Sequence, residues 1–353
     1  AGSARIRLAD KLPQGQASLS IGQHGYLRGV VADSLDAGPG TLLFGLEMNR
    51  NNGPWDVPES VRKYSGVLRY SQGTQDDGFS VTGMAYKNSW NATDQVPLRA
   101  VESGLIGRFG SLAPSDGGDT SRYSLSYALR KRTQNRLFEF DAYVIRSQLE
   151  LNSDFTYFLA DAQQGDQFQQ SERRTVAGVN ASESWTTELA GLAMRNKLGV
   201  QARFDRLSPV GLYNTVERIR HSTVREDRVR ESSVGLYGEN TLQWLPWLRS
   251  VAGLRYDAYR FSVASSIEGN SGTANDHVVS PKLSLIFGPW SKTEFFVNYG
   301  KGFHSNDARG TTQTRLPDGA ASTPVTPLVP TKGMELGART EWLPGLQSSL
   351  ALW

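Results

Sequence analysis

Short stretches in which apolar and polar residues alternate dominate the chain. Around residues 122–130, every second position is apolar: Tyr123, Leu125, Tyr127 and Leu129. The same alternation recurs near residues 64–71, 138–144, 200–205, 254–259 and 293–300. Successive side chains of a β-strand point to opposite faces, so this period predicts amphipathic strands. Continued along the chain, it predicts about fifteen strands of roughly ten residues each.

The segments between these strands alternate in length. Short turns are expected near residues 36–40, 73–77, 131–135, 244–247, 288–291 and 343–345. Long polar segments are expected at residues 51–62, 88–121, 161–174, 208–232, 265–278 and 305–331. Short turns on one side and long loops on the other are typical of outer-membrane barrels, whereas a soluble sandwich has no reason to keep that order. The predicted fold class is therefore all-β, an antiparallel transmembrane β-barrel.

Tryptophans mark three of the short turns and support this orientation. Trp244, Trp247, Trp290 and Trp342 lie in or beside them, as expected for an aromatic girdle at the lipid–water boundary. One apolar set is then predicted to face lipid. It comprises Tyr123, Leu125, Tyr127, Leu129, Phe138, Phe140, Phe204, Leu283, Leu285, Phe295, Val297 and Tyr299.

The composition excludes several other classes. The 353 residues are 38% hydrophobic and contain no apolar run approaching the ~18 residues of a transmembrane helix. A mean hydropathy of −0.42 remains compatible with barrel strands, because half of their residues avoid lipid. A net charge of +3 from 38 basic and 35 acidic residues does not indicate a nucleic-acid partner. The first five residues lack the apolar core of a signal peptide, so an exported protein would be represented here by its mature chain or an internal piece.

Several segments resemble the barrel of TonB-dependent outer-membrane receptors. "VVSPKLSLIFGPWSKTEFFVNYGKGFHSNDARG" (278–310) resembles a Ser-Pro-Lys strand, a periplasmic turn, an aromatic strand and a long extracellular loop of that family. "LVPTKGMELGART" (328–340) looks like the next strand, and "SVGLYGENTLQWLPWLRSVAGLRYDAYRF" (233–261) resembles the hairpin upstream. "ATDQVPLRAV" (92–101) and "TYFLADAQQGDQF" (156–168) resemble further segments of one branch. Together these motifs occur in the order of the family.

The resemblance implies a barrel of about 22 strands in the bacterial outer membrane, closed by an N-terminal plug. Such receptors import scarce nutrients such as ferric siderophores, with energy from the TonB complex, which contacts the plug. Residues 1–15 look like the crossing from plug to barrel, and residues 16–353 like part of the barrel, so we expect a fragment without the plug and the last strands. The expected partners are outer-membrane lipid, lipopolysaccharide and a small-molecule nutrient, including a metal chelate. No cofactor is expected.

Charged residues on the predicted polar face are candidates for the barrel interior. They are Arg69, Glu139, Asp141, Arg203, Asp205, Arg255 and Asp257. Glu139 and Asp141 resemble the carboxylate pair of a glycosidase, but lumen lining explains them more simply because both charge signs share the face. We therefore expect no catalytic residue. Since no Gly-x-Ser-x-Gly elbow and no metal-binding histidine spacing occur, we also expect neither an acyl-transfer enzyme nor a metal site.

Polar residues on the long-loop side are candidates for extracellular contacts with substrate. His304, Asn306, Asp307 and Arg309 follow an aromatic strand, and their alternative role is hydrogen bonding within their own loop. Arg225, Arg228 and Arg230 lie in an arginine-rich segment that is predicted to form an extended hairpin rather than a helix. These arginines are suited to lipopolysaccharide phosphates or an anionic ferric chelate. Because acidic residues interleave them, cross-strand ion pairs are the alternative.

Two other functions remain compatible with parts of the pattern. A passive porin would share the strands but need no plug. A soluble β-rich enzyme or lectin would alternate in the same way, and it would remain in solution without detergent.

Overall fold

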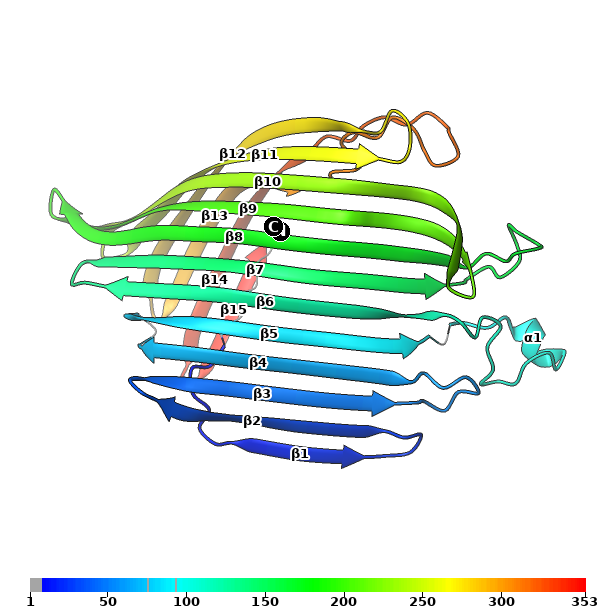
Figure 1. Cartoon of the computed structure of the whole chain (residues 1–353). Coiled ribbons are helices and arrows are strands. Elements are labelled where there is room, and N and C mark those ends of the chain that lie inside the picture. The colour runs from blue at the N-terminus through cyan, green and yellow to red at the C-terminus, as the bar shows by residue number, and fades with distance from the viewer. Residues whose placement is uncertain (1–7, 75, 93) are drawn as a thin grey trace.

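The computed structural model describes residues 8–74, 76–92 and 94–353, and it consists of one antiparallel sheet. The sheet contains 15 strands, each hydrogen-bonded to its neighbours in the sequence. Figure 1 shows this sheet curved into an open wall, with β13, β14 and β15 passing behind the middle strands. β1 and β15 form its two edges, so the sheet is not closed. The all-β prediction and the number of strands are confirmed.

The strands lengthen towards the middle of the chain. They are β1 (Gln16–Ile21), β2 (Leu27–Ala37), β3 (Gly40–Asn51), β4 (Val61–Gly73), β5 (Gly78–Asn91), β6 (Gly117–Arg132), β7 (Arg136–Ser153), β8 (Phe168–Leu189), β9 (Leu192–Val216), β10 (Ile219–Leu245), β11 (Leu248–Ser265), β12 (Gly272–Trp290), β13 (Thr293–Ser305), β14 (Leu328–Leu343) and β15 (Leu346–Leu352). One short helix, α1 (Leu98–Glu102), lies in the β5–β6 loop. Within the described ranges, no helix is long and apolar enough to cross a membrane.

The alternation of short turns and longer loops is present, but several expected loops are partly strand. Residues 168–174 belong to β8 and residues 272–278 to β12. Long loops join β5 to β6, β7 to β8 and β13 to β14, whereas β8 to β9 and β10 to β11 are joined by two residues. Residues 208–232 were expected to be a long loop, but they form the ends of β9 and β10 around the turn Glu217–Arg218. Both turn residues have positive φ, of 51° and 68°, as in the tight turns that close hairpins. The predicted extended hairpin is thus confirmed, and its loop is much shorter than the polar composition suggested.

The ladder register separates two faces of the sheet. Residues directly opposite each other in an antiparallel ladder share a face. Leu125 pairs with Val144, Val144 with Ala177, and Ala177 with Phe204. We call the face with these residues the outer face. Arg203 and Asp257 lie on the opposite, inner face. All twelve side chains predicted to face lipid have the outer-face register, and Tyr123 and Leu125 are about half exposed.

An apolar band crosses the outer face between two polar rows. The row nearer the long loops contains Arg146, Thr175, Arg206 and Arg230. The row nearer the short turns contains Arg136, Trp185, Asn196 and Asn240. Ten residues separate the two rows on β7, β9 and β10, which is the length of a membrane-spanning strand. The outer positions between them are Phe138, Phe140, Ala142 and Val144 on β7, Leu198, Val200, Ala202 and Phe204 on β9, and Ser232, Val234, Leu236 and Gly238 on β10.

From β7 to β10 the band has one charged member, and its margin carries aromatic rings. Glu183 of β8 lies in the lowest apolar row, where its carboxylate forms an ion pair with Arg136 at 3.0 Å. Trp247 and Trp290, at neighbouring short turns, stack with their ring centroids 6.1 Å apart. This arrangement fits the girdle that was predicted from the sequence.

Glycines on the inner face make room for tyrosine rings of neighbouring strands. Tyr143 lies over its cross-strand partner Gly178, where an added Cβ would be 2.6 Å from the tyrosine oxygen. Tyr237 lies over its partner Gly199 in the same way. These rings therefore lie flat against the wall instead of projecting from it.

The start of the described chain contacts the inner face. Residues 8–15 precede β1, and Asp10 Oδ1 lies 2.6 Å from Arg69 Nη2. The predicted crossing covers residues 1–15, and its residues 1–7 lie outside the described residues.

Candidate functional site

Ion pairs hold the charged residues of the inner face. Every residue that was predicted to line the lumen has an oppositely charged partner. The pairs are Arg69–Asp10 at 2.6 Å, Glu139–Arg130 at 3.2 Å, Glu139–Lys197 at 2.9 Å, Asp141–Arg130 at 3.0 Å, Arg203–Asp205 at 2.6 Å and Arg255–Asp257 at 2.7 Å.

Some of these pairs link strands, whereas Arg203–Asp205 lies within β9 and Arg255–Asp257 within β11. Arg130 of β6 contacts both Glu139 and Asp141 of β7, and Glu139 also contacts Lys197 of β9. Asp205 and Asp257 are almost completely buried beneath their arginines. A charge that leaves bulk water needs such a partner, because its desolvation is otherwise uncompensated. The inner face is therefore polar but locally neutral.

A second cluster of charges lies at the long-loop end of the inner face. Arg225 Nε is 2.5 Å from Asp227 Oδ2, and Arg225 Nη1 donates to Gln313 Oε1 at 2.6 Å. Asp227 has 0% exposure. Arg309 and Asp307, from the β13–β14 loop, form a pair at 2.6 Å, and Arg309 also interacts with the charge of Asp227. We call Arg225, Asp227, Asp307, Arg309 and Gln313 the loop-end cluster.

The electrostatics of the loop-end cluster favour charged groups. Burial acts to raise the pKa of Asp307, but hydrogen bonds from Arg309 outweigh it and leave the pKa below its ordinary value. Two buried polar atoms, Asp227 Oδ1 and Arg225 Nη2, have no hydrogen-bond partner within the described residues. The cluster therefore combines ion pairs with unused hydrogen-bonding capacity on a donor and on an acceptor.

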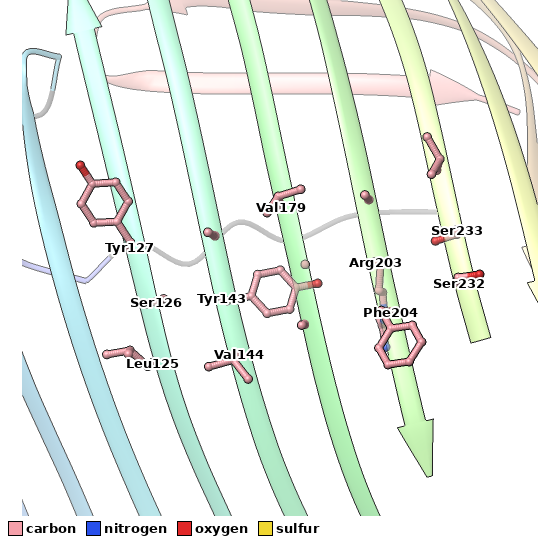
Figure 2. A pocket seen from close by; sticks show the side chains of 15 residues that line it. Leu125, Ser126, Tyr127, Tyr143, Val144, Val179, Arg203, Phe204, Ser232 and Ser233 are labelled. Carbon is pink, nitrogen blue, oxygen red and sulfur yellow. The ribbon is translucent and has the colours of Figure 1, made fainter. Parts of the chain in front are cut away.

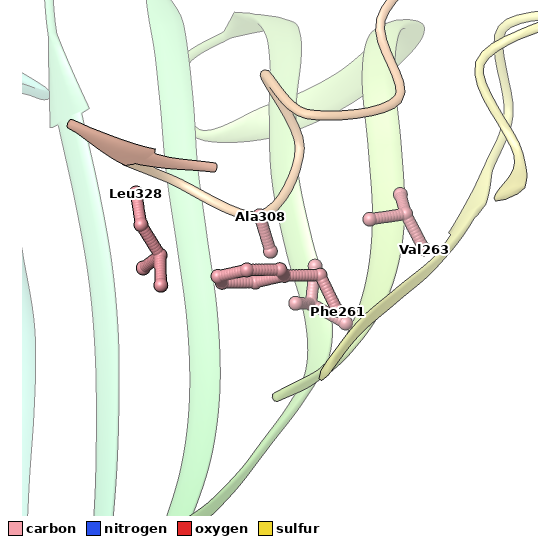
Figure 3. Packing of buried hydrophobic residues seen from close by; sticks show 5 residues of the cluster. Phe261, Val263, Ala308 and Leu328 are labelled. Atoms are coloured by element: carbon pink, nitrogen blue, oxygen red, sulfur yellow. The ribbon is translucent and has the colours of Figure 1, made fainter. Parts of the chain in front are cut away.

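The β13–β14 loop reaches this position because it packs on an apolar part of the inner face. Figure 3 shows Ala308 and Leu328 against Phe261, a side chain with 0% exposure. Val229 and Val263 complete this cluster. Burial of such side chains fixes the loop against the wall and brings Asp307 and Arg309 close to β10.

A buried asparagine ties a second loop to the first. Asn270, in the β11–β12 loop, donates from Nδ2 to the carbonyl of Arg315, and its Oδ1 accepts from the amides of Thr314 and Arg315. Thr312 Oγ1 donates back to the carbonyl of Asn270. The two loops therefore form one unit above the barrel wall.

The four predicted residues that follow the aromatic strand do not all converge. His304 is exposed at the end of β13. Asn306 donates to the carbonyl of Thr326 at 2.7 Å, within its own loop. Asp307 and Arg309 pair with each other and join Arg225. The loop-end cluster therefore includes two of the four, while the contacts of Asn306 are those of the alternative reading, bonding within the loop.

The three predicted arginines of β10 lie on different faces. Arg225 belongs to the loop-end cluster, but Arg228 and Arg230 have the outer-face register, opposite Ala264 and Ser262 of β11. Sequence reasoning missed this division because it treated residues 208–232 as a loop. It also missed Gln313 and Asn270, since isolated amides in polar loops carry no spacing signal.

A carboxylate network joins two of the other loops. Asp116 is 1% exposed, and its carboxylate accepts hydrogen bonds from the Asp154 amide at 2.8 Å and from Gln167 Nε2 at 2.7 Å. Burial, with a smaller contribution from neighbouring Asp94, raises the pKa of Asp116 to about 7. In the β7–β8 loop, Thr156 and backbone amides hold the pKa of Asp166 at about 2.

Comparisons with known proteins agree with this architecture. A family model described as TonB dependent receptor-like, beta-barrel, matches residues 47–353. Among solved structures, the siderophore receptor PiuA from Acinetobacter baumannii is similar with a TM-score of 0.75 at 9% identity, over 97% of this chain and 57% of that one. The ferric citrate transporter FecA in its unliganded form is similar with a TM-score of 0.71 at 12% identity, over 96% of this chain and 49% of that one. The alcaligin receptor FauA from Bordetella pertussis is similar with a TM-score of 0.67 at 15% identity, over 98% of this chain and 52% of that one.

The chain thus spans about half the length of these solved structures. At such identities, the similarity shows the fold. No curated protein matches the sequence.

Proposed function

This chain belongs to the TonB-dependent receptor β-barrel family, and we propose that it forms the barrel portion of a transporter that imports a scarce nutrient across the bacterial outer membrane. The observation that carries the proposal is the contrast between the two faces of one sheet. An apolar band of spanning length covers the outer face, and paired charges cover the inner face. Such a wall suits lipid on one side and a hydrated interior on the other.

In the complete protein, the seven charged residues of the inner wall line the barrel interior and face the plug. Neutral pairs on the wall allow a polar plug to be accommodated without a strong net field. Movement of the plug by the TonB complex would then expose a hydrated path. Transport along this path would therefore depend on the energy that the TonB complex supplies to move the plug.

Cargo contact is assigned to the loop-end cluster, together with exposed His304 and Asn306. Arg309 presents a partly exposed guanidinium group where the β13–β14 loop meets β10, beside Arg225, whose buried Nη2 has no partner within the described residues. The similar proteins are named as siderophore and ferric citrate receptors. We infer that the cargo is an anionic metal chelate such as a ferric siderophore.

Uptake by the full-length protein tests the transport proposal. A strain that lacks its own receptors would be supplied with the complete gene, and the accumulation of radiolabelled ferric chelates would be measured with and without a protonophore. The proposal predicts saturable accumulation that the protonophore abolishes. Accumulation that survives the protonophore and scales linearly with concentration would instead indicate a passive porin.

Cargo contact is tested separately with Arg309→Gln. Loss of this guanidinium should weaken chelate binding roughly tenfold or more, as expected for a charge-assisted hydrogen bond. Lys332→Gln removes a charge from the exposed part of β14 and serves as the control. Unchanged chelate affinity in Arg309→Gln would remove the loop-end cluster from the cargo site and leave transport itself untouched.

A further inference from the structure

The ladder between β12 and β13 stops before either strand ends. Its last pair is Lys282 with Gly300. Beyond this pair, the described ladder joins residues 272–281 of β12 to β11 alone, and residues 301–305 of β13 to residues 328–332 of β14 alone. β12 therefore has an unpaired edge in its long-loop half. We call residues 301–305 and 328–332 together the arm.

Side chains of the arm lie on the opposite side of the wall from the one that their ladder positions assign. Phe303 and Leu328 have the same parity as Tyr299, an outer-face residue. Both nevertheless pack in the cluster around Phe261, which belongs to the inner face (Figure 3). The ring of Phe303 also meets that of Tyr259 edge to face, with centroids 5.8 Å apart. The arm has therefore crossed from the line of the wall to its inner side.

The middle of the sheet shows the regular arrangement. In Figure 2, the strands from β6 to β10 run side by side, and Leu125, Val144 and Phe204 share one level of the outer face. The ladder is continuous there, so each side chain stays on the face that its parity assigns. The arm differs because its pairing with β12 is missing.

The arm covers the inner face of β12 instead of extending beside that strand. Ala274 and Val278, inner-face residues of β12, pack against the same apolar cluster. The amide of Leu328 donates a hydrogen bond to Asp276 Oδ2 of β12 at 3.2 Å. Apolar burial thus favours the inner position, at the expense of the backbone pairs that β12 and β13 would otherwise form.

Two glycines lie opposite each other at the base of the arm. Gly300 of β13 pairs with Gly333 of β14, at the level of the last pair with β12. A Cβ added at Gly333 would meet no atom within 4 Å, so packing does not require glycine there. Glycine allows a strand to bend because it lacks a Cβ. The glycine pair therefore has the position and the freedom of a hinge.

The unpaired edge of β12 lies at the depth of the apolar band. His277 and Val279 share the ladder rows of Val234 and Leu236, which are members of the band. Lipid offers no hydrogen-bond partner to a strand edge, so the backbone groups of this edge favour a pairing strand. Two resting places therefore compete for the arm, one on the inner face and one in the wall.

We propose that the arm is a hinged flap that alternates between its inner position and the wall, where residues 301–305 pair with the free edge of β12. The register of the existing ladder, continued beyond Lys282 and Gly300, places Ser305 opposite His277. The inner position buries the apolar cluster, and the wall position completes the backbone ladder.

The flap controls the loop-end cluster. Asp307 and Arg309 follow directly after the arm, and the packing of Ala308 and Leu328 holds them near Arg225. Return of the arm to the wall withdraws both residues from the cluster. This consequence rests on the proposed role of the loop-end cluster in cargo contact, whereas the movement itself does not.

A disulfide in the full-length receptor in lipid vesicles reports the wall position. The chain contains no cysteine, so His277→Cys with Ser305→Cys adds one defined pair of thiols. Residues directly opposite each other in a ladder have Cβ atoms about 4.5–5.5 Å apart, and a disulfide needs little adjustment from there. Oxidation should cross-link this pair, which is detected as a change in mobility on a denaturing gel.

Two further pairs calibrate the reaction. Leu283→Cys with Tyr299→Cys joins residues that are already opposite each other and should cross-link readily. His277→Cys with Val297→Cys joins residues that lie far apart along the ladder and should not cross-link. An unreactive His277–Ser305 pair beside a fully oxidised Leu283–Tyr299 pair would overturn the proposal, as would equal reaction of the distant pair.

Substitutions at the arm should change the rate of cross-linking between positions 277 and 305. Leu328→Ala weakens the inner position and should accelerate it severalfold. Gly333→Val stiffens the hinge without a steric clash and should slow it severalfold. Leu336→Ala, on the exposed part of β14 beyond the arm, is the control and should leave the rate unchanged. Equal rates in all three variants would contradict a hinged flap.

Chelate binding tests the control of the loop-end cluster. The receptor cross-linked between positions 277 and 305 should bind the ferric chelate that it takes up best at least roughly tenfold more weakly, as expected for the loss of a charge-assisted hydrogen bond. Reduction of the disulfide should restore the affinity. Unchanged affinity of the cross-linked receptor would overturn this control. Because the gel assay does not depend on uptake, failure of the transport proposal would leave the test of the flap intact.

Discussion

Arg203 and Arg206 belong to the same strand and are both exposed, but they lie on opposite faces and differ in their partners. Arg203 lies on the inner face, where Asp205 is 2.6 Å from its guanidinium. Arg206 lies on the outer face, exposed, opposite Arg230 and without a carboxylate partner in the described residues. Three residues along β9 therefore separate a compensated charge from an uncompensated one.

The difference shows how one strand meets two media. Inside a barrel, a charge is held against a wall and requires a fixed partner. On the proposed lipid side, Arg136 at the short-turn margin pairs with Glu183, whereas Arg206 at the long-loop margin is left to the lipid surface and water.

The largest effect on stability is expected when one member of a buried ion pair on the inner face is removed. Asp227→Ala leaves Arg225 charged and largely enclosed, so the free energy of unfolding should fall by about 3–5 kcal/mol. Urea denaturation of the receptor in lipid vesicles measures the change. The double replacement Arg225→Met with Asp227→Leu should recover most of the loss, because it removes both charges. A loss in the double variant as large as in Asp227→Ala would argue against an electrostatic origin.

The next largest effect on stability is expected when a charged residue is placed within the apolar band. Leu125→Arg or Phe140→Arg should cost about 2–4 kcal/mol at mid-membrane depth, since lipid supplies no hydrogen-bond acceptor. The same denaturation experiment measures it. Ser124→Arg, one residue away on the inner face, is the matched control and should cost much less. Folding of both outer-face variants as efficiently as the wild type would contradict the assignment of that face to lipid.

The acidic network of the loops predicts a dependence on pH. The pKa of Asp116 is about 7 in the folded loops, above its ordinary value of 3.8. Its stabilising contribution is therefore fully present below about pH 4 and is lost as the pH rises through 7. Hydrogen exchange, corrected for intrinsic rates, should show weaker protection of the Asp154 amide at pH 8 than at pH 5.

A single substitution sharpens this prediction. Asp94→Asn removes the neighbouring charge that helps to raise the pKa of Asp116. The decline in protection of the Asp154 amide should therefore occur at a lower pH than in the wild type. Protection that increases between pH 5 and pH 8 would have the wrong sign for a buried protonated carboxyl group.

The smallest effect is expected at the exposed outer-face Arg206. Arg206→Gln should change the stability by no more than about 0.5 kcal/mol, because no partner in the protein is lost. The inner-face Arg203→Gln, which leaves Asp205 buried without its partner, should be clearly more destabilising. Equal effects of the two substitutions on the urea midpoint would remove the distinction between the faces.

Much of this fold could be predicted from the alternation of residues. The strand number, the antiparallel order and the apolar set of the outer face follow from side-chain period and loop lengths, as at Leu125 and Phe204. Ser208–Ser232 was misjudged because strands that project beyond the membrane carry polar residues on both faces. Polarity there resembles that of a loop, although the backbone remains paired across β9 and β10.

The candidate site was less predictable. Arg225 and Arg230 look alike in sequence, and a ladder irregularity between Asp227 and Val229 lies between them. The extra residue of this bulge lies on β9, so positions five apart on β10 still face opposite sides; the division was missed because the segment was taken for a loop. The meeting of Arg309 with Arg225 depends on the packing of Ala308 against Phe261, a contact between distant segments that no local pattern encodes.

The most direct test of the account is a scan of β9 with spin labels. The chain contains no cysteine, so single cysteines at successive positions from Leu198 to Arg206 can be labelled without removing any native thiol. In the full-length receptor in lipid vesicles, the collision rates with oxygen and with a water-soluble nickel chelate would be measured by electron paramagnetic resonance. We predict high oxygen accessibility at Leu198, Val200, Ala202 and Phe204, with nickel accessibility rising sharply at Arg206. Nickel accessibility that is uniform along both faces, or oxygen maxima at Arg203 and Asp205, would contradict a wall between lipid and a hydrated interior.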